Sequence, residues 1–209
     1  MLSMLQFPSM VRNVAVCGHL HHGKTALLDM LVHETHVMAW DSDKQVRKTI
    51  CGATIVLLMI PCVPQLRYTD THPLSIAREI SLKSSPLSLV LQSSTGKSHL
   101  FNLIDTPGHV NFVDEVASAI RLVDGIVLVV DVVEGVSSIV CFQAPYQTDA
   151  RHQVMSNTEA IIRHALSQNV AITLVLNKID RLILELRVPP SDAYFKIKAT
   201  IEEVNNVIA

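Results

Sequence analysis

Hydrophobic and polar positions alternate along this chain in blocks that predict strands and helices in turn. Two short runs, residues 125–133 and 170–176, are almost wholly apolar, and a third, residues 11–16, ends in the apolar residues Val14, Ala15 and Val16 before a glycine-containing turn. Strands that are apolar on both faces are typical of a parallel sheet covered by helices. Two further runs, residues 86–92 and 99–105, are joined by the polar segment STGKS, which predicts a β-hairpin.

Segments with apolar residues at helical spacing lie between and after these strands. They are residues 24–34, 111–123, 158–168 and 192–208. The first predicted helix has one apolar face made of Leu27, Met30 and Leu31. The last has a predicted core face made of Tyr194, Ile197, Ile201, Val204 and Ile208. Strands alternating with helices predict an α/β fold with a mostly parallel sheet flanked by helices.

The first candidate site follows the first predicted strand and opens the first predicted helix. Its sequence fits the phosphate-binding pattern G-x-x-x-x-G-K-[ST] and reads Gly18-His19-Leu20-His21-His22-Gly23-Lys24-Thr25. Backbone N–H groups of such a loop wrap the phosphates, and the helix N-terminus adds its positive dipole end. We predict that Lys24 reaches the β and γ phosphates and that the Thr25 hydroxyl ligates magnesium. The sequence therefore predicts a P-loop NTPase.

The side chains within and just before this loop have several possible roles. The histidines His19, His21 and His22 occupy its variable positions, and we interpret them as solvent-facing. A metal site made by these histidines is the alternative interpretation. Cys17 is predicted to pack behind the loop.

A second motif, Asp105-Thr-Pro-Gly108-His109, ends a strand of the predicted hairpin. A carboxylate at a strand end, such as Asp105, can hold magnesium, often through water. Gly108 permits its backbone N–H to approach a γ-phosphate closely. His109 follows this glycine, at the place where an attacking water would lie, and we predict that it orients this water. A structural or surface role is the alternative for this histidine.

A third motif, Asn177-Lys178-Ile179-Asp180, ends the last predicted strand. Asp180 can accept hydrogen bonds from N1–H and the exocyclic amine of guanine, whereas adenine would leave the buried aspartate unpaired. Asn177 is predicted to bond the acceptor side of the ring and to tie down the P-loop. The Lys178 stem can lie on the base. The motifs in this order predict GTP and GDP as ligands with Mg²⁺ as cofactor.

Composition narrows the class of protein. The chain of 209 residues is 49% hydrophobic, which favours a globular fold, and its formal net charge of -2 argues against direct DNA binding. Its longest apolar run, residues 53–63, is interrupted by Pro61 and is shorter than the roughly 20 residues that cross a membrane. The four cysteines show no C-x-x-C pairing, which indicates a reducing, intracellular compartment.

The segments GHLHHGKT, DTPGHVNFVDEV and NKID together resemble the translational GTPases, in particular the elongation factor 2 class. Within that class, VRNVAVCGHLHHGKT, LRYTDTH, LKSSPLSLVL and NKIDRLILELRVPPSDAY resemble the spliceosomal branch, the GTPases of the U-five small nuclear ribonucleoprotein. The resemblance covers residues 1–46, 66–135 and 157–209. It implies a GTPase switch that acts in pre-mRNA splicing in the nucleus, with spliceosomal proteins and the U-five small nuclear RNA as partners.

Two other functions stay open at this point. One is that of the ribosomal translocation factor, elongation factor 2, with the ribosome as partner and a cytoplasmic location. Its P-loop resembles AHVDHGKST, with aspartate where this chain has His21. The other is a guanine-nucleotide-binding fragment that does not hydrolyse GTP or is inactive.

The resemblance also implies a third metal-binding hydroxyl. The family's switch I threonine closes over magnesium and the γ-phosphate, and Ser81 falls at its position. The predicted metal ligands are therefore Thr25, Ser81 and Asp105. The family usually has a glycine before Ile80, where this chain has Glu79, so switch I departs from the family pattern.

Two segments, residues 47–65 and 137–156, have no counterpart in the family pattern, and we interpret them as insertions or gene-model artefacts. Residues 1–209 are expected to form a partial translation-factor-type G domain, C-terminally incomplete. The family's last guanine-contacting loop and its later domains are expected beyond residue 209.

Overall fold

A computed structural model describes residues 7–35, 68–93, 96–134 and 150–209 of the chain. The segment 47–65 lies outside the described residues, as does 137–149 of the second segment that we interpret as an insertion. Both interpretations, and the expected partial G domain, therefore stay predictions. Residues 150–156 form the beginning of a helix.

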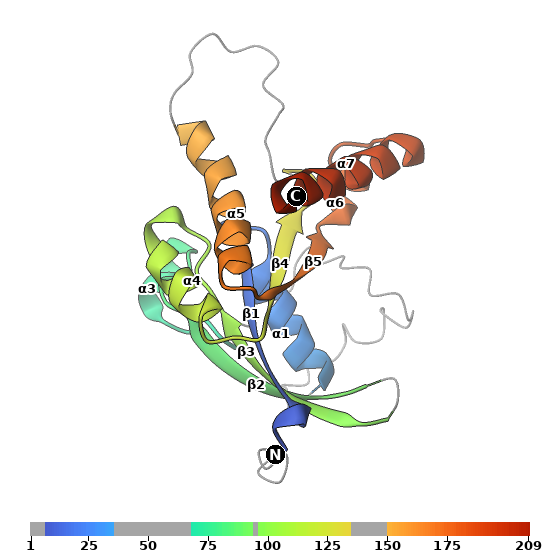
Figure 1. The fold of residues 1–209 in the computed structure, drawn as a ribbon. Coiled ribbons are helices and arrows are strands. Elements are labelled where there is room, and N and C mark those ends of the chain that lie inside the picture. Colours follow the sequence, from blue (N-terminus) through green and yellow to red (C-terminus); the bar gives the residue numbers. More distant parts are fainter. Residues whose placement is uncertain (1–6, 36–67, 94–95, 135–149) are drawn as a thin grey trace, which may run out of the picture.

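Within these residues, five strands form one mixed sheet in the order β2-β3-β1-β4-β5 (Figure 1). The parallel strands are β1 (Val11–Gly18), β3 (Ser98–Asp105), β4 (Gly125–Asp131) and β5 (Ala171–Asn177). Strand β2 (Ser85–Gln92) pairs antiparallel with β3. The predicted α/β fold, the mostly parallel sheet and the hairpin are thus confirmed.

The register of the sheet brings the carboxyl ends of the parallel strands together. Val16 of β1 pairs with Asp105 of β3, and Asp131 of β4 pairs with Asn177 of β5. In open α/β sheets, ligands bind outside this edge. Each of the predicted motifs therefore begins at the same edge.

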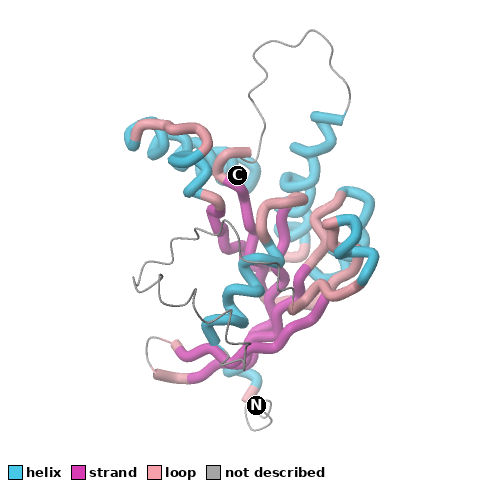
Figure 2. Tube along the Cα trace, turned by 180° about the vertical axis from the view of Figure 1, so that it is seen from behind, coloured by secondary structure: helices cyan, strands magenta, loops and turns pink. Residues whose placement is uncertain are grey.

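Helices cover both faces of the sheet. They are α1 (Lys24–Thr35), α3 (Pro73–Arg78), α4 (Val113–Ile120), α5 (Ala150–Ser167), α6 (Ile179–Leu184) and α7 (Pro190–Ile208), with short 3-10 helices η2 (Pro8–Met10) and η4 (Val110–Phe112). Buried residues of α1 pack with β1, β2, β3 and β4 on one face. Those of α4, α5 and α7 pack on the other, so Figure 2, seen from behind, shows α1 on the face opposite α4 and α5.

The predicted core face of α1 is displaced by one position. Leu28 and Val32 are its buried apolar residues, while Leu27 and Leu31 are partly buried beside them. Leu28 and Val32 are four positions apart and lie one above the other on the helix, so both point into the sheet.

The predicted core face of α7 is wrong at Tyr194, whose side chain is 62% exposed. The buried residues of α7 are Thr200 and Val204. Ile201 and Ile208 are exposed because α7 packs against α5 through a narrow stripe, and they lie outside it. Helix α3 and helix α6 are additions that the hydrophobic pattern did not predict.

Candidate nucleotide site

The predicted P-loop lies between the end of β1 and the start of α1. Gly18 has a φ of 151° and Gly23 a φ of 92°, both unfavourable for residues with a side chain. A Cβ on Gly18 would collide with the carbonyl of Val129, and one on Gly23 would collide with the side-chain amide of Asn177. The glycines therefore let the loop pass close to the ends of β4 and β5.

Lys24, the lysine of the loop, is buried, and its Nζ donates to the carbonyl of His19 over 2.7 Å. Burial lowers the pKa of Lys24 to about 8, although the charge of Asp105 acts in the opposite direction. A Cβ on Gly108 would collide with this Nζ and with the backbone of His19 and Leu20, so the glycine lets the second motif approach the P-loop and its lysine. The structure thus brings Lys24 and Gly108 together as the sequence predicts.

The buried carboxylate of Asp105 and the hydroxyls of Thr25 and Thr69 lie together in one corner of the site, where magnesium is predicted to bind. Thr25 Oγ1 donates to Asp105 Oδ2 over 2.8 Å, and Thr69 Oγ1 lies 3.3 Å from the same oxygen. Burial raises the pKa of Asp105, while the hydrogen bond from Thr25 and the charge of Lys24 lower it. Its Oδ1 is buried and has no hydrogen-bond partner among the described residues. Hydroxyl and carboxylate oxygens with a free lone pair fit the ligand preference of Mg²⁺.

Ser81, the third predicted metal ligand, does not join this corner. Within the described ranges, no hydrogen bond links its hydroxyl to Thr25 or Asp105. The hydroxyl of Thr69 is there instead, and sequence reasoning missed it. Thr69 lies in the segment LRYTDTH, which entered the sequence analysis only as part of the family resemblance.

His109 is held at the start of η4. Its Nδ1 accepts a hydrogen bond from the backbone N–H of Asn111 over 3.2 Å, so the neutral ring carries its proton on Nε2. The carbonyl of Gly108 accepts from the side-chain amide of Asn157 over 3.2 Å. Asn157 lies on α5 and is only 5% exposed. It fixes the peptide that joins Gly108 to His109, a role the sequence analysis missed.

The guanine-reading motif is bonded directly to the P-loop. Asn177 Nδ2 donates to the carbonyl of His22 over 2.8 Å, and Asn177 Oδ1 accepts from the backbone N–H of Lys178 over 2.8 Å. Lys178 has a φ of 59° and precedes α6. Asp180 lies half-buried in the first turn of α6, and its carboxylate makes no hydrogen bond or ion pair with another described residue. The predicted tie between Asn177 and the P-loop is therefore present.

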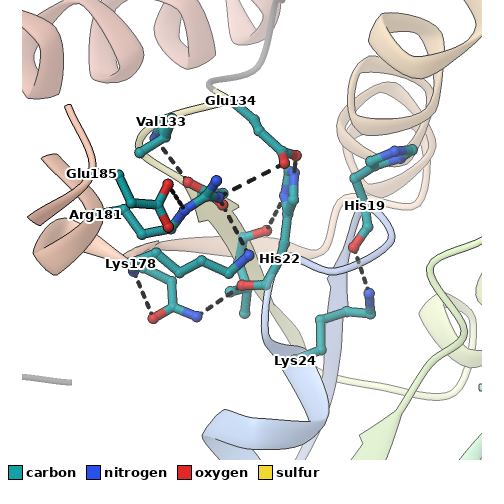
Figure 3. A network of polar contacts seen from close by, with 11 residues as sticks. His19, His22, Lys24, Val133, Glu134, Lys178, Arg181 and Glu185 are labelled. Carbon is teal, nitrogen blue, oxygen red and sulfur yellow. Dashed lines mark hydrogen bonds and ion pairs between the residues drawn. The ribbon is translucent and has the colours of Figure 1, made fainter. Parts of the chain in front are cut away.

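Asp131, which the sequence analysis missed, contacts Lys178, Arg181 and Val133, and Figure 3 labels these three partners. Its Oδ2 lies 2.7 Å from Arg181 Nη1 and 3.0 Å from Lys178 Nζ, and its Oδ1 accepts from the backbone N–H of Val133 over 2.8 Å. Burial by itself raises the pKa of Asp131, but hydrogen bonds from Lys178 and Val133 and the charges of Lys178 and Arg181 hold it below its ordinary value.

The interpretation of the loop histidines as solvent-facing is wrong for His22, which is 2% exposed. Its Nδ1 lies 3.2 Å from the Val129 carbonyl and its Nε2 lies 3.2 Å from Glu134 Oε2. The ring is buried because it fills the space beside the end of β4, and burial lowers its pKa.

The other loop histidines differ from His22. His21 is exposed, as predicted, whereas His19 is half-buried and burial lowers its pKa to about 4. Among the described residues, no cluster of three or more His, Cys, Asp or Glu side chains could hold a metal ion. Cys17 is fully buried behind the loop as predicted, and burial raises its pKa to about 11.

Comparison with known proteins decides the family. Residues 9–208 match the family described as "Elongation factor Tu GTP binding domain". The chain belongs to this family. As a GTP binding domain of this family, it carries its three sequence motifs at one edge of the sheet, where the register places their strand ends.

Relatives of this GTP binding domain include a small nuclear ribonucleoprotein component and a pre-mRNA-splicing factor. The chain is 43% identical over 209 residues to the "110 kDa U5 small nuclear ribonucleoprotein component CLO" of Arabidopsis thaliana, covering 100% of this chain and 18% of that protein. It is 48% identical over 198 residues to "Pre-mRNA-splicing factor cwf10" of Schizosaccharomyces pombe, covering 95% of this chain and 16% of that protein. The predicted resemblance to the spliceosomal branch is confirmed. The chain thus spans less than a fifth of the length of these relatives.

A solved structure from Thermus thermophilus has the same fold, with a TM-score of 0.60 and 18% identity. The match covers 92% of this chain and 22% of the solved chain. None of the helices among the described residues combines the length and apolar character that a membrane crossing needs.

Proposed function

We propose that this domain binds GTP and GDP together with Mg²⁺ and hydrolyses GTP slowly as a conformational switch in pre-mRNA splicing. The observation that carries the proposal is the link between its two halves. The amide of Asn177 is bonded to the P-loop at His22, so the base-reading turn and the phosphate-binding loop form one site. The similarity to a U5 small nuclear ribonucleoprotein component and to a pre-mRNA-splicing factor supports the process in which it acts.

In this site, the P-loop N–H groups and the buried Lys24 would hold the β and γ phosphates. Thr25 and Asp105 would hold Mg²⁺. The buried Oδ1 of Asp105, which has no hydrogen-bond partner among the described residues, supports this assignment. A bound Mg²⁺ supplies positive charge that stabilises the phosphates during transfer. Ser81 stays a predicted ligand from the resemblance, while Thr69 is the hydroxyl next to Asp105 in the structure.

His109 would place the attacking water. Because its Nδ1 accepts from Asn111, the proton on Nε2 can be donated to a water oxygen, which orients that water toward the phosphate. Gly108 would meet the γ-phosphate with its backbone N–H. Phosphoryl transfer needs mainly such positioning and electrostatic stabilisation, which agrees with slow hydrolysis in the absence of a partner.

At the base, Asp180 would accept the two guanine donors, and the Lys178 stem would lie on the ring. The free carboxylate of Asp180 among the described residues supports this assignment. In the cell, we propose a nuclear location with spliceosomal proteins and the U-five small nuclear RNA as partners.

Multiple-turnover phosphate release by the chain of 209 residues tests the hydrolysis. We expect Mg²⁺-dependent release from GTP and not from ATP, reduced about 100-fold or more by His109→Ala. If the chain binds GDP but releases no phosphate from GTP, the non-hydrolysing alternative is favoured. Crosslinking of the protein in cells tests the process: recovery of the U-five small nuclear RNA supports the proposal, and recovery of ribosomal RNA supports the ribosomal alternative.

A further inference from the structure

The buried carboxylate of Asp131 contacts both sides of the guanine-reading turn. Lys178, directly before the turn's Ile179 and Asp180, lies 3.0 Å from its Oδ2, and Arg181, directly after them, lies 2.7 Å from the same oxygen. Figure 3 shows the side chains of Lys178 and Arg181 pointing from α6 and its N-terminal turn toward the end of β4. In the sequence, Asp180 therefore lies between two cationic residues, Lys178 and Arg181, that both pair with Asp131.

The sheet fixes where this anion lies. Asp131 is the last residue of β4 and pairs with Asn177, the last residue of β5, so the carboxylate sits beside the point where the turn begins. Its second oxygen accepts from the backbone N–H of Val133 over 2.8 Å. Asp131 is fully buried, which makes its side chain a fixed point rather than a flexible surface charge.

The turn itself requires such a restraint. Lys178 is in the left-handed backbone region, with a φ of 59°, which is unfavourable for a residue with a long side chain. Arg181 is held a second time, since its Nε lies 2.8 Å from Glu185 Oε2 at the end of the same helix. The ion pairs with Asp131 thus attach both the strained residue and the first turn of α6 to β4.

We infer that Asp131 is a positioning residue for guanine selection: by holding Lys178 and Arg181, it fixes the orientation of Asp180 toward the base. This inference deepens the proposed function and rests on the assignment of residues 177–180 as the guanine-reading turn. Loss of the carboxylate would remove the anion that Lys178 and Arg181 share. Arg181 would keep its pair with Glu185, but Lys178 would no longer be held beside it, and the two cations would move apart. The position of Asp180, which lies between them, would then be lost.

The experiment compares the affinities of the chain for GDP and for IDP, the inosine analogue that lacks the exocyclic amine. Asp180 reads this amine, so the ratio of the two affinities reports how well Asp180 is placed. We expect Asp131→Asn to weaken GDP binding about tenfold and IDP binding less, so that the GDP/IDP ratio falls at least about threefold. Asp131→Glu, which keeps the charge, is expected to restore part of the ratio. Glu202→Gln is the matched control, because it neutralises a carboxylate in the exposed pair with Lys198.

Arg181→Gln provides a second variant that does not depend on replacing a fully buried residue. It releases the far side of the turn, and we expect it to lower the GDP/IDP ratio as well. A GDP/IDP ratio that stays unchanged in both variants, whether or not the two affinities fall together, would overturn the role of Asp131. A wild-type chain without preference for GDP over IDP would instead overturn the guanine site itself, and with it this inference.

Discussion

Asn177 donates its side-chain amide to the backbone carbonyl of His22 over 2.8 Å, across 155 positions of the chain. The bond is buried, and a Cβ on Gly23 would occupy the place of the donating nitrogen. Asn177 also accepts from the backbone of Lys178 with its side-chain oxygen. One amide group therefore sets the distance between the phosphate-binding loop and the base-reading turn.

Replacement of Asn177 by Ala is expected to weaken GDP binding about 10- to 100-fold. The change leaves the His22 carbonyl buried without its donor, and such a loss costs about 1–3 kcal/mol. Titration of a fluorescent GDP analogue measures the effect. Asn206→Ala, at an exposed position of α7, is the control. Unchanged affinity in Asn177→Ala would show that the two halves of the site do not depend on this bond.

Replacement of Asn157 by Leu is expected to slow single-turnover GTP hydrolysis about tenfold or more while GDP affinity changes little. The amide of Asn157 holds the Gly108 carbonyl, and misplacement of the Gly108–His109 peptide would misplace the water-orienting ring. Rapid mixing of the chain with GTP and Mg²⁺, followed over time, measures the rate. An equal loss of GDP affinity would mean that Asn157 supports the fold rather than His109.

Thr69→Ala and Ser81→Ala distinguish the two candidate switch hydroxyls. Thr69 lies 3.3 Å from Asp105 Oδ2, whereas within the described ranges Ser81 makes no hydrogen bond with this carboxylate. We therefore expect Thr69→Ala to raise the Mg²⁺ concentration needed for half-maximal GTP binding about threefold or more, and Ser81→Ala to leave it unchanged. The reverse result would favour the family's switch I threonine position at Ser81.

Affinity for GDP is expected to fall as the pH rises above about 8. Burial lowers the pKa of Lys24 to about 8, and a bound phosphate stabilises its charged form, so the pKa is higher in the complex. Below pH 8 the amine is protonated in both states, and above it binding must take up a proton. Titrations between about pH 7 and 9 at constant ionic strength measure the slope, which is at most about tenfold per pH unit.

Lys24→Arg is the control for this pH dependence. A guanidinium stays charged throughout the range, so any remaining affinity of this variant should be independent of pH. A wild-type affinity that is flat between about pH 7 and 9 would contradict the assignment of Lys24 as the titrating phosphate ligand.

The local sequence pattern was sufficient to predict the strands of the sheet and the motifs that follow them, because apolar strand segments and glycine-containing turns leave strong local signals. It failed at α6, whose apolar residues Ile183 and Leu184 are exposed and so follow no core-facing period. It also misplaced the face of α7 at Tyr194, since only packing against α5 decides which apolar residues of that helix are covered.

Within the candidate site, the local sequence pattern could not predict contacts between segments that are distant in the sequence. The pair of Asp131 with Lys178 depends on the register of β4 and β5, which no spacing in the sequence reveals. The burial of His22 depends likewise on Glu134 and the end of β4. A polar residue that ends an apolar strand, as Asp131 does, was the signal that could have been used.

Competition binding with Asp180→Asn tests whether this edge of the sheet holds a guanine-specific site. A fluorescent GDP analogue bound to the chain with Mg²⁺ is displaced by GDP, ATP or XDP, the xanthine nucleotide. We predict that GDP displaces it from the wild-type chain and ATP does not, and that Asp180→Asn reverses the preference toward XDP. If the variant still prefers GDP, or if ATP displaces the analogue from the wild-type chain as well as GDP does, Asp180 does not select guanine at this site.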